Sequence, residues 1–162
     1  MIDKLNLKEI IFQLIPVFKE AGSIASELQK KGLEIKTKED LSPVTNGDLK
    51  VNELIINRIN QAYQDTNWEI LSEENFKIQS NYFNNVDWLW VLDPLDGTKD
   101  FIQGTQNYAM HLALNYKRKP YIGIVLIPEK DELWISDGEK IWCENRDGNI
   151  RKQNILSLIH IS

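Results

Sequence analysis

The segment of residues 93–101 holds the side chains with the clearest capacity for chemistry. It reads Asp-Pro-Leu-Asp-Gly-Thr-Lys-Asp-Phe and directly follows the apolar run at 88–92. Because proline and glycine favour a tight turn, Asp93 and Asp96 can converge on one point at the end of a buried strand. Converging oxygen ligands suit Mg²⁺, a hard cation that keeps waters it can exchange for a substrate phosphate.

Two more polar residues, one before this segment and one within it, could act together with Asp93 and Asp96. Glu73 follows a second short apolar run at 68–71 and offers a further carboxylate to the same edge, while Thr98 offers a hydroxyl that can position a water. The alternative is that the segment forms only a turn, the usual role of Asp, Pro and Gly after a strand. The haloacid-dehalogenase signature, Asp-x-Asp-Gly-Thr after a strand, is excluded because two residues separate the aspartates.

Helical periodicity dominates the first third of the chain. Apolar residues at helical spacing predict a long helix from a capping box at Asn6 and Glu9 to near Gly32, kinked or split at Pro16. A second helix is predicted to begin near Asp48. Its apolar residues are Val51, Leu54, Ile55, Ile59 and Ala62.

Strand patterns follow. The runs at 68–71 and 88–92 predict buried strands. A strand meander is predicted at 108–116, 121–127, 132–136 and 140–144. Helices first and hairpins afterwards favour an α+β layered domain, with two helices packed on a largely antiparallel sheet, over a doubly wound fold.

Composition limits the class of protein. The 162 residues, 42% of them hydrophobic, suit one globular domain, and the net charge of −5 argues against a general nucleic-acid or anionic-membrane binder. The single cysteine, Cys143, and the two histidines exclude an internal disulfide and a Cys/His zinc cluster. With no leader pattern and no long apolar stretch, we expect no membrane span. The expected location is the cytoplasm, with peripheral contact at the inner face of the membrane as the alternative.

Two further polar groups have simpler interpretations. His111 lies in the apolar strand pattern at 108–114 and is interpreted as a core residue, not as a ligand. Lys38, with Lys36, precedes the second predicted helix and is interpreted as part of a solvated loop.

Three ordered motifs resemble one known family. Ser-Pro-Val-Thr-x-x-Asp at 42–48, Leu-Ser-Glu-Glu at 71–74 and the acidic segment at 93–101 are similar to signatures of the inositol monophosphatase superfamily, the lithium-sensitive, magnesium-dependent phosphomonoesterases. Within it, the pattern most resembles 3'(2'),5'-bisphosphate nucleotidases of the CysQ type. The resemblance implies a layered, sugar-phosphatase-like fold, of which residues 1–155 would be the N-terminal domain.

The resemblance also implies a metal site with two or three Mg²⁺ ions. Its ligands would be the carboxylates of Glu73, Asp93 and Asp96 and the backbone carbonyl of Leu95.

Substrate and water are implied to bind beside these ions. The backbone N–H groups of Gly97 and Thr98, at the start of a helix, would hold the phosphate. Substrate contacts would come from Glu73, Leu95, Asp96, Gly97 and Thr98. Asp48 and Thr98 would orient and deprotonate the attacking water, with Glu73 assisting through a metal.

The implied substrate is a small phosphate monoester, 3'-phosphoadenosine 5'-phosphate. Hydrolysis of its 3'-phosphate gives AMP and phosphate and clears a by-product of sulfate assimilation. The alternatives are an inositol monophosphatase-type phosphatase and a catalytically incomplete fragment that binds metal. No nucleic-acid partner is expected.

The end of the sequence departs from the family pattern. Family members continue into a further domain whose Trp-Asp motif completes the metal site, and the sequence given stops before that motif. We expect a phosphomonoesterase, with a chain left inactive by truncation as the alternative. Residues 156–162 do not resemble the family continuation but do resemble translated sequencing-adapter DNA. We expect this tail not to be native.

Overall fold

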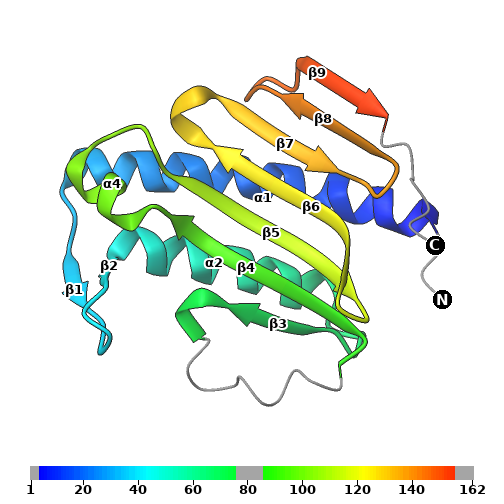
Figure 1. The fold of residues 1–162 in the computed structure, drawn as a ribbon, viewed down its shortest axis with the longest axis horizontal. Helices are drawn as coiled ribbons and strands as arrows, with labels where there is room; N and C mark the ends of the chain where they lie inside the picture. Colours follow the sequence, from blue (N-terminus) through cyan, green and yellow to red (C-terminus); the bar gives the residue numbers. More distant parts are fainter. Residues whose placement is uncertain (1–3, 76–85, 156–162) are drawn as a thin grey trace.

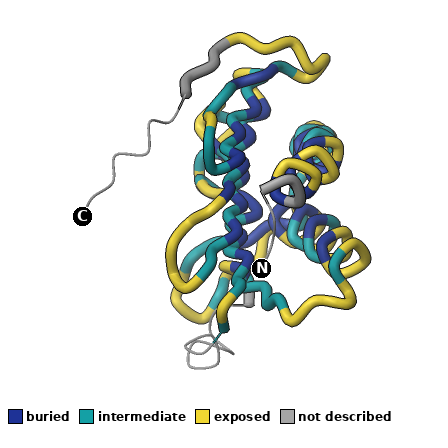
Figure 2. The backbone as a smooth tube through the Cα atoms, turned by 90° about the vertical axis from the view of Figure 1, so that its right-hand side faces the viewer, coloured by how far each residue is buried: buried dark blue, intermediate teal, exposed yellow. Residues whose placement is uncertain are grey.

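The computed structural model describes residues 4–75 and 86–155, and the predicted non-native tail at 156–162 lies outside the described residues. Two long helices, α1 (Lys4–Lys31) and α2 (Asn46–Ala62), pack on one face of a seven-stranded sheet (Figure 1). Figure 2 shows this sheet edge-on, with the helices on one side of it. The predicted α+β layered fold is therefore confirmed.

The sheet follows the order of its strands along the chain. The order is β3 (Glu69–Ser72), β4 (Trp88–Asp96), β5 (Ala109–Tyr116), β6 (Lys119–Ile127), β7 (Glu132–Ser136), β8 (Lys140–Glu144) and β9 (Ile150–Ile155). Strands β4 to β9 form an antiparallel meander, of which β5 to β8 match the predicted one, whereas β3 and β4 run parallel. Because parallel strands end at the same edge, this pair determines which residues meet at the acidic segment.

A two-stranded hairpin and short helices complete the described chain. Strands β1 (Ile35–Thr37) and β2 (Pro43–Thr45) pair antiparallel, and α4 (Thr98–Gln103) follows β4. Two 3₁₀ turns, η1 (Glu73–Asn75) and η3 (Pro128–Lys130), follow β3 and β6. In Figure 1 the hairpin and α4 lie at the same end of the sheet.

Alternating side chains build the core between helices and sheet. Met110, Leu112 and Leu114 of β5 are buried toward the helices, whereas His111 and Ala113 on the opposite face are only half-buried. Phe18 of α1 and Ile55 of α2 are fully buried in the same cluster. The strand period of two residues thus separates the core face from the face that carries polar groups.

The start and the middle of α1 differ from the predictions. The described helix already includes Lys4, so Asn6 lies inside it and not at the predicted position before its first turn. Of the two predicted effects of Pro16, a kink or a split, the split is wrong, because the helix is continuous through this residue. Leu14 and Phe18 on either side are almost fully buried, and we attribute the continuity to their packing, which offsets the cost of the proline, about 3 kcal/mol.

The second helix starts two residues before the predicted position. Thr45 caps α2: its Oγ1 accepts hydrogen bonds from the N–H groups of Gly47 at 3.1 Å and Asp48 at 3.3 Å. In return, Asp48 Oδ2 accepts a hydrogen bond from Thr45 N at 2.8 Å, which completes a capping box. Asp48 is therefore held rigidly in the first turn of the helix.

Within residues 4–75 and 86–155, no helix is both long enough and apolar enough to span a bilayer.

Candidate metal centre

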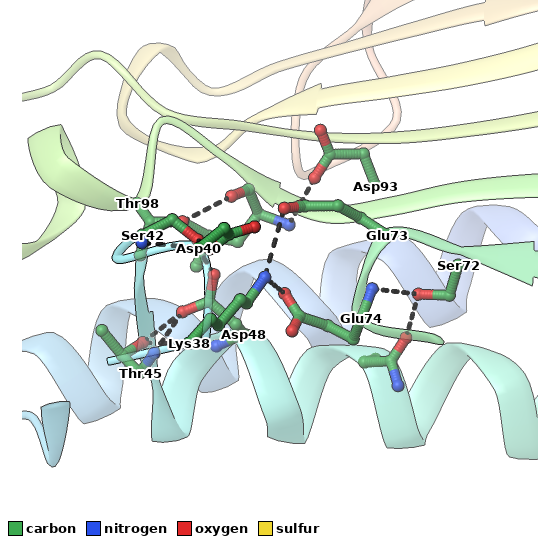
Figure 3. A network of polar contacts seen from close by, with 12 residues as sticks. Lys38, Asp40, Ser42, Thr45, Asp48, Ser72, Glu73, Glu74, Asp93 and Thr98 are labelled. Atoms are coloured by element: carbon green, nitrogen blue, oxygen red, sulfur yellow. Dashed lines mark hydrogen bonds and ion pairs between the residues drawn. The ribbon is translucent and has the colours of Figure 1, made fainter. Parts of the chain in front are cut away.

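The parallel pairing of β3 and β4 brings two acidic segments to one edge of the sheet. Ser72, the last residue of β3, lies opposite Leu92 of β4. Glu73 and Asp93 come directly after these partners, so their side chains lie next to each other, as Figure 3 shows. The carboxyl groups of Glu73 and Asp93 are close enough to share a hydrogen bond.

A bulge in β4 turns the second aspartate to the same face. Asp93 lies opposite His111 and Asp96 lies opposite Ala109, so three steps along β4 match two steps along β5. In a regular strand, residues three apart face opposite sides, and the extra residue cancels this alternation. Asp93 and Asp96 converge through this bulge, not through the tight turn that the sequence pattern predicts.

His111 completes a group of three possible metal ligands, contrary to its interpretation as a core residue. One ligand atom each from Asp93, Asp96 and His111 lie within 4.8 Å of one another. The residue is half-buried on the face that points away from the helices. The apolar pattern around it correctly indicates a strand, but it does not show that Asp93 is the cross-strand neighbour.

The electrostatics of this cluster favour a bound cation. Burial, together with the nearby charges of Glu73 and Asp96, raises the pKa of Asp93 from 3.8 to about 6. Like charges in a half-buried position repel one another, and a divalent ion held among them removes that cost. The donor set of carboxylate oxygens and one imidazole nitrogen fits a metal ion.

The stability of the metal-free chain should decrease as pH rises from about 4 to 6. In this window Asp93 holds its proton in the folded chain but has lost it in the unfolded chain, because its folded pKa is the higher one. The folded state then binds more protons, so raising the pH favours unfolding. Thermal unfolding with a chelator present, compared with Asp93→Asn, measures this contribution. A difference between the two proteins that stays constant from pH 4 to 7 contradicts it.

Lys38 contacts the acidic cluster from the hairpin side. Its Nζ lies 3.2 Å from Glu73 Oε1 and 2.9 Å from Glu74 Oε1 (Figure 3). Burial disfavours its charge, but the hydrogen bonds and charges of the two glutamates outweigh burial and raise the pKa of Lys38. With its side chain only 20% exposed, Lys38 is not the solvated loop residue that the sequence pattern suggests. A pocket of about 750 Å³ lies beside Lys38, Glu73 and Asp93.

A second polar group joins the first turns of α2 and α4. Thr98 Oγ1 donates a hydrogen bond to Asp48 Oδ1 at 2.9 Å, although 50 residues separate them. Asp48 Oδ2 also accepts from Thr45 Oγ1 at 2.5 Å. Asp48 is 1% exposed, so protein groups and not bulk water hold its carboxylate in place.

The backbone of Leu95 links the two polar groups. Its N–H donates to Asp93 Oδ1 at 3.2 Å, and its carbonyl oxygen lies 3.2 Å from Thr98 Oγ1. The side chain of Leu95 is buried in the core, which anchors this backbone position. Contacts therefore connect five residues of the sequence motifs in one site: Glu73, Asp93, Leu95, Thr98 and Asp48.

Gly97 lies where the turn after β4 passes close to the backbone of Asn107. Its φ is +89°, and a Cβ placed on it would lie 2.6 Å from the backbone oxygen of Asn107. Only glycine fits this turn between β4 and α4 without strain.

Gly97→Ala should destabilise the fold more than Gly104→Ala does. Both residues have positive φ, but nothing lies within 4 Å of a Cβ at Gly104. The left-handed conformation costs each variant about 1–2 kcal/mol. The clash with Asn107 adds about 1–3 kcal/mol to Gly97→Ala alone. Denaturant unfolding of both variants measures the difference, and equal losses contradict the close approach.

Comparisons with known proteins converge on one family. The model of the "Inositol monophosphatase family" matches residues 6–161. The chain is 30% identical over 125 residues to 3'(2'),5'-bisphosphate nucleotidase CysQ of Haemophilus influenzae, covering 76% of this chain and 46% of that protein. It is 32% identical over 149 residues to the chloroplastic bifunctional phosphatase IMPL2 of Arabidopsis thaliana, covering 87% of this chain and 40% of that protein. The chain thus spans about half the length of these curated relatives.

Solved structures share the fold. A staphylococcal inositol monophosphatase-1 soaked with LiCl matches with a TM-score of 0.74 and 24% identity, covering 85% of this chain and 51% of that one. An IMPase/NADP phosphatase complexed with Mg²⁺ and phosphate matches with a TM-score of 0.72 and 23% identity, over 85% and 51% of the two chains.

Proposed function

Because the chain belongs to the inositol monophosphatase family, we propose that it acts in the metal-dependent hydrolysis of small phosphate monoesters. One observation carries the proposal: Glu73, Asp93 and Asp96 converge at a sheet edge, and Leu95 joins them to the Asp48–Thr98 pair. Metal ligands and a pair that positions the attacking water are two components that a metal-dependent phosphate ester hydrolase uses.

In this proposal, Glu73, Asp93, Asp96 and the carbonyl oxygen of Leu95 hold the metal ions. The structural relative with Mg²⁺ and phosphate bound supports magnesium as the cofactor. We propose that two or three such ions bind. Bound ions would lower the pKa of the attacking water and neutralise charge on the leaving oxygen. The half-buried, mutually repelling carboxylates supply the negative charge that retains such ions.

Asp48 and Thr98 position the attacking water. Since the Thr98 hydroxyl donates its proton to Asp48, its oxygen lone pairs remain free to accept a hydrogen bond from water. The capping contacts of Thr45 fix the Asp48 carboxylate, and Asp48 receives the proton that leaves the water through Thr98. Backbone N–H groups of Gly97 and Thr98, at the start of α4, hold the phosphate. Displacement is in line, and no covalent phosphoenzyme forms.

We assign 3'-phosphoadenosine 5'-phosphate as the substrate, with AMP and phosphate as products. The motifs at 42–48 and 71–74 and the similarity to a CysQ nucleotidase support this assignment. The similarity to bifunctional phosphatase IMPL2 favours a second candidate, an inositol monophosphatase-type substrate. The coverage of about half of each relative favours a third, a metal-binding fragment whose activity requires more chain.

Two measurements on the same preparation distinguish these candidates. Phosphate release is measured with 3'-phosphoadenosine 5'-phosphate and with inositol 1-phosphate in the presence of Mg²⁺, and Mg²⁺ binding is measured by calorimetry. Faster release from the nucleotide supports the first candidate, and faster release from the inositol phosphate supports the second. Binding without release supports the third. A chain that neither binds Mg²⁺ nor releases phosphate contradicts the proposal.

A further inference from the structure

His111 lies next to the acidic cluster through strand pairing. It is the direct cross-strand partner of Asp93 in the antiparallel β4–β5 ladder, so the two side chains project from the same face of the sheet. The bulge brings Asp96 opposite Ala109, two residues before His111 and on that same face. One ligand atom from each of Asp93, Asp96 and His111 lies within 4.8 Å of the other two.

The chemistry of this group differs from an all-oxygen magnesium site. Mg²⁺ prefers oxygen ligands in near-ideal octahedral geometry and keeps several waters. An imidazole nitrogen is a softer donor and suits first-row transition ions, which accept mixed nitrogen and oxygen ligands. Two carboxylates with one imidazole thus form a donor set that binds such an ion more tightly than it binds Mg²⁺.

We propose that His111 is a metal ligand that determines specificity, binding through an imidazole nitrogen the ion that Asp93 and Asp96 hold. The inference rests on the proposed function only in using the same acidic cluster. It adds that the site prefers a divalent first-row transition ion, represented by Mn²⁺, over Mg²⁺. His111 then contributes to the choice of ion, while Glu73, which directly follows β3, supplies charge.

Pulsed electron paramagnetic resonance of bound Mn²⁺ tests the ligand directly, because it detects a coordinated nitrogen nucleus. The chain contains only two histidines, His111 and His160. In His160→Asn, His111 is the single imidazole, so a nitrogen signal from a histidine has one possible source. Labelling that variant with ¹⁵N-histidine should change the coupling from a ¹⁴N to a ¹⁵N pattern without altering any residue near the site.

His111→Asn, with His160→Asn as its matched control, tests the preference for the ion. We expect the imidazole coupling to disappear in His111→Asn and to remain in His160→Asn. Competition calorimetry should show that Mn²⁺ affinity falls about tenfold or more in His111→Asn, whereas Mg²⁺ affinity changes much less. Circular dichroism of both variants verifies that they are folded. If His111→Asn is unstable, the ¹⁵N-labelled His160→Asn protein still tests whether His111 binds the ion, because it keeps His111.

The outcomes separate this inference from the proposed function. Mn²⁺ binding without imidazole coupling, or coupling that survives His111→Asn, overturns the role of His111 and leaves the acidic site intact. A wild-type chain that binds neither Mn²⁺ nor Mg²⁺ overturns both proposals. Equal loss of Mn²⁺ and Mg²⁺ affinity in His111→Asn overturns the preference for a transition ion.

Discussion

Replacing Asp93 with Asn should abolish metal-dependent phosphate release and, without metal, leave the fold as stable as before or more stable. Asp93 lies at the centre of the cluster, in contact with Glu73 and opposite His111. Charge stabilisation by a metal contributes several kcal/mol to such a reaction, so its loss should lower the rate by about 1000-fold or more. Removing a charge that burial and two neighbouring carboxylates disfavour relieves repulsion in the metal-free chain.

Activity is expected to fall while the stability of the metal-free chain stays equal or rises, and this combination makes the prediction specific. Wild-type protein should gain thermal stability when Mg²⁺ is added, because a ligand that binds only the folded state stabilises it. Without metal, Asp93→Asn should have a thermal unfolding midpoint equal to or higher than that of the wild type. Its midpoint should rise little when Mg²⁺ is added. The matched control is Asp87→Asn, which removes one negative charge from an exposed residue directly before the same strand. If Asp93→Asn keeps near wild-type Mg²⁺ binding, or if its metal-free form is strongly destabilised, the metal assignment is wrong.

The sequence was sufficient to predict the parts of the fold that depend on local periodicity. Helix α2 and strands β3 to β8 lie where the apolar patterns place them, and the helices cover one face of a largely antiparallel sheet. Strands β1 and β2 were missed because they have three residues each and β1 is exposed throughout, so burial leaves no alternation there. Strand β9 was also missed as a strand, since its sequence Ile-Arg-Lys-Gln-Asn-Ile has an apolar residue only at each end.

The site depends on contacts between residues far apart in the chain, which local patterns do not contain. The ends of two apolar runs correctly suggested that Glu73 and Asp93 share an edge, because β3 and β4 are parallel. The β4 bulge and the pairing of Asp93 with His111 are properties of register, and register is not visible in one strand alone. Lys38 reaches Glu73 across 35 residues through the hairpin that was missed. The catalytic and binding roles themselves remain predictions.

Replacing Thr98 with Val should lower the rate of phosphate release by about 100-fold while metal binding stays close to wild type. Valine has nearly the shape of threonine but lacks the hydroxyl that donates to Asp48 at 2.9 Å. The water would lose the group that orients it and relays its proton, a contribution of about 10²–10⁴-fold in general acid–base catalysis. Asp48 would keep its two contacts with Thr45, so α2 should remain capped.

Two companion variants show whether the hydroxyl or the packing of Thr98 matters. Thr98→Ser keeps the hydroxyl and should stay within a few-fold of the wild-type rate, with unchanged Mg²⁺ affinity. Thr105→Val removes a comparable hydroxyl, which donates to Asp100 Oδ1 at 2.6 Å near the end of α4 and away from Asp48. It should cost about 1 kcal/mol of stability, as a typical lost hydrogen bond does, but little activity. Similar rates for Thr98→Val and Thr105→Val would show that Thr98 stabilises the turn and does not position water.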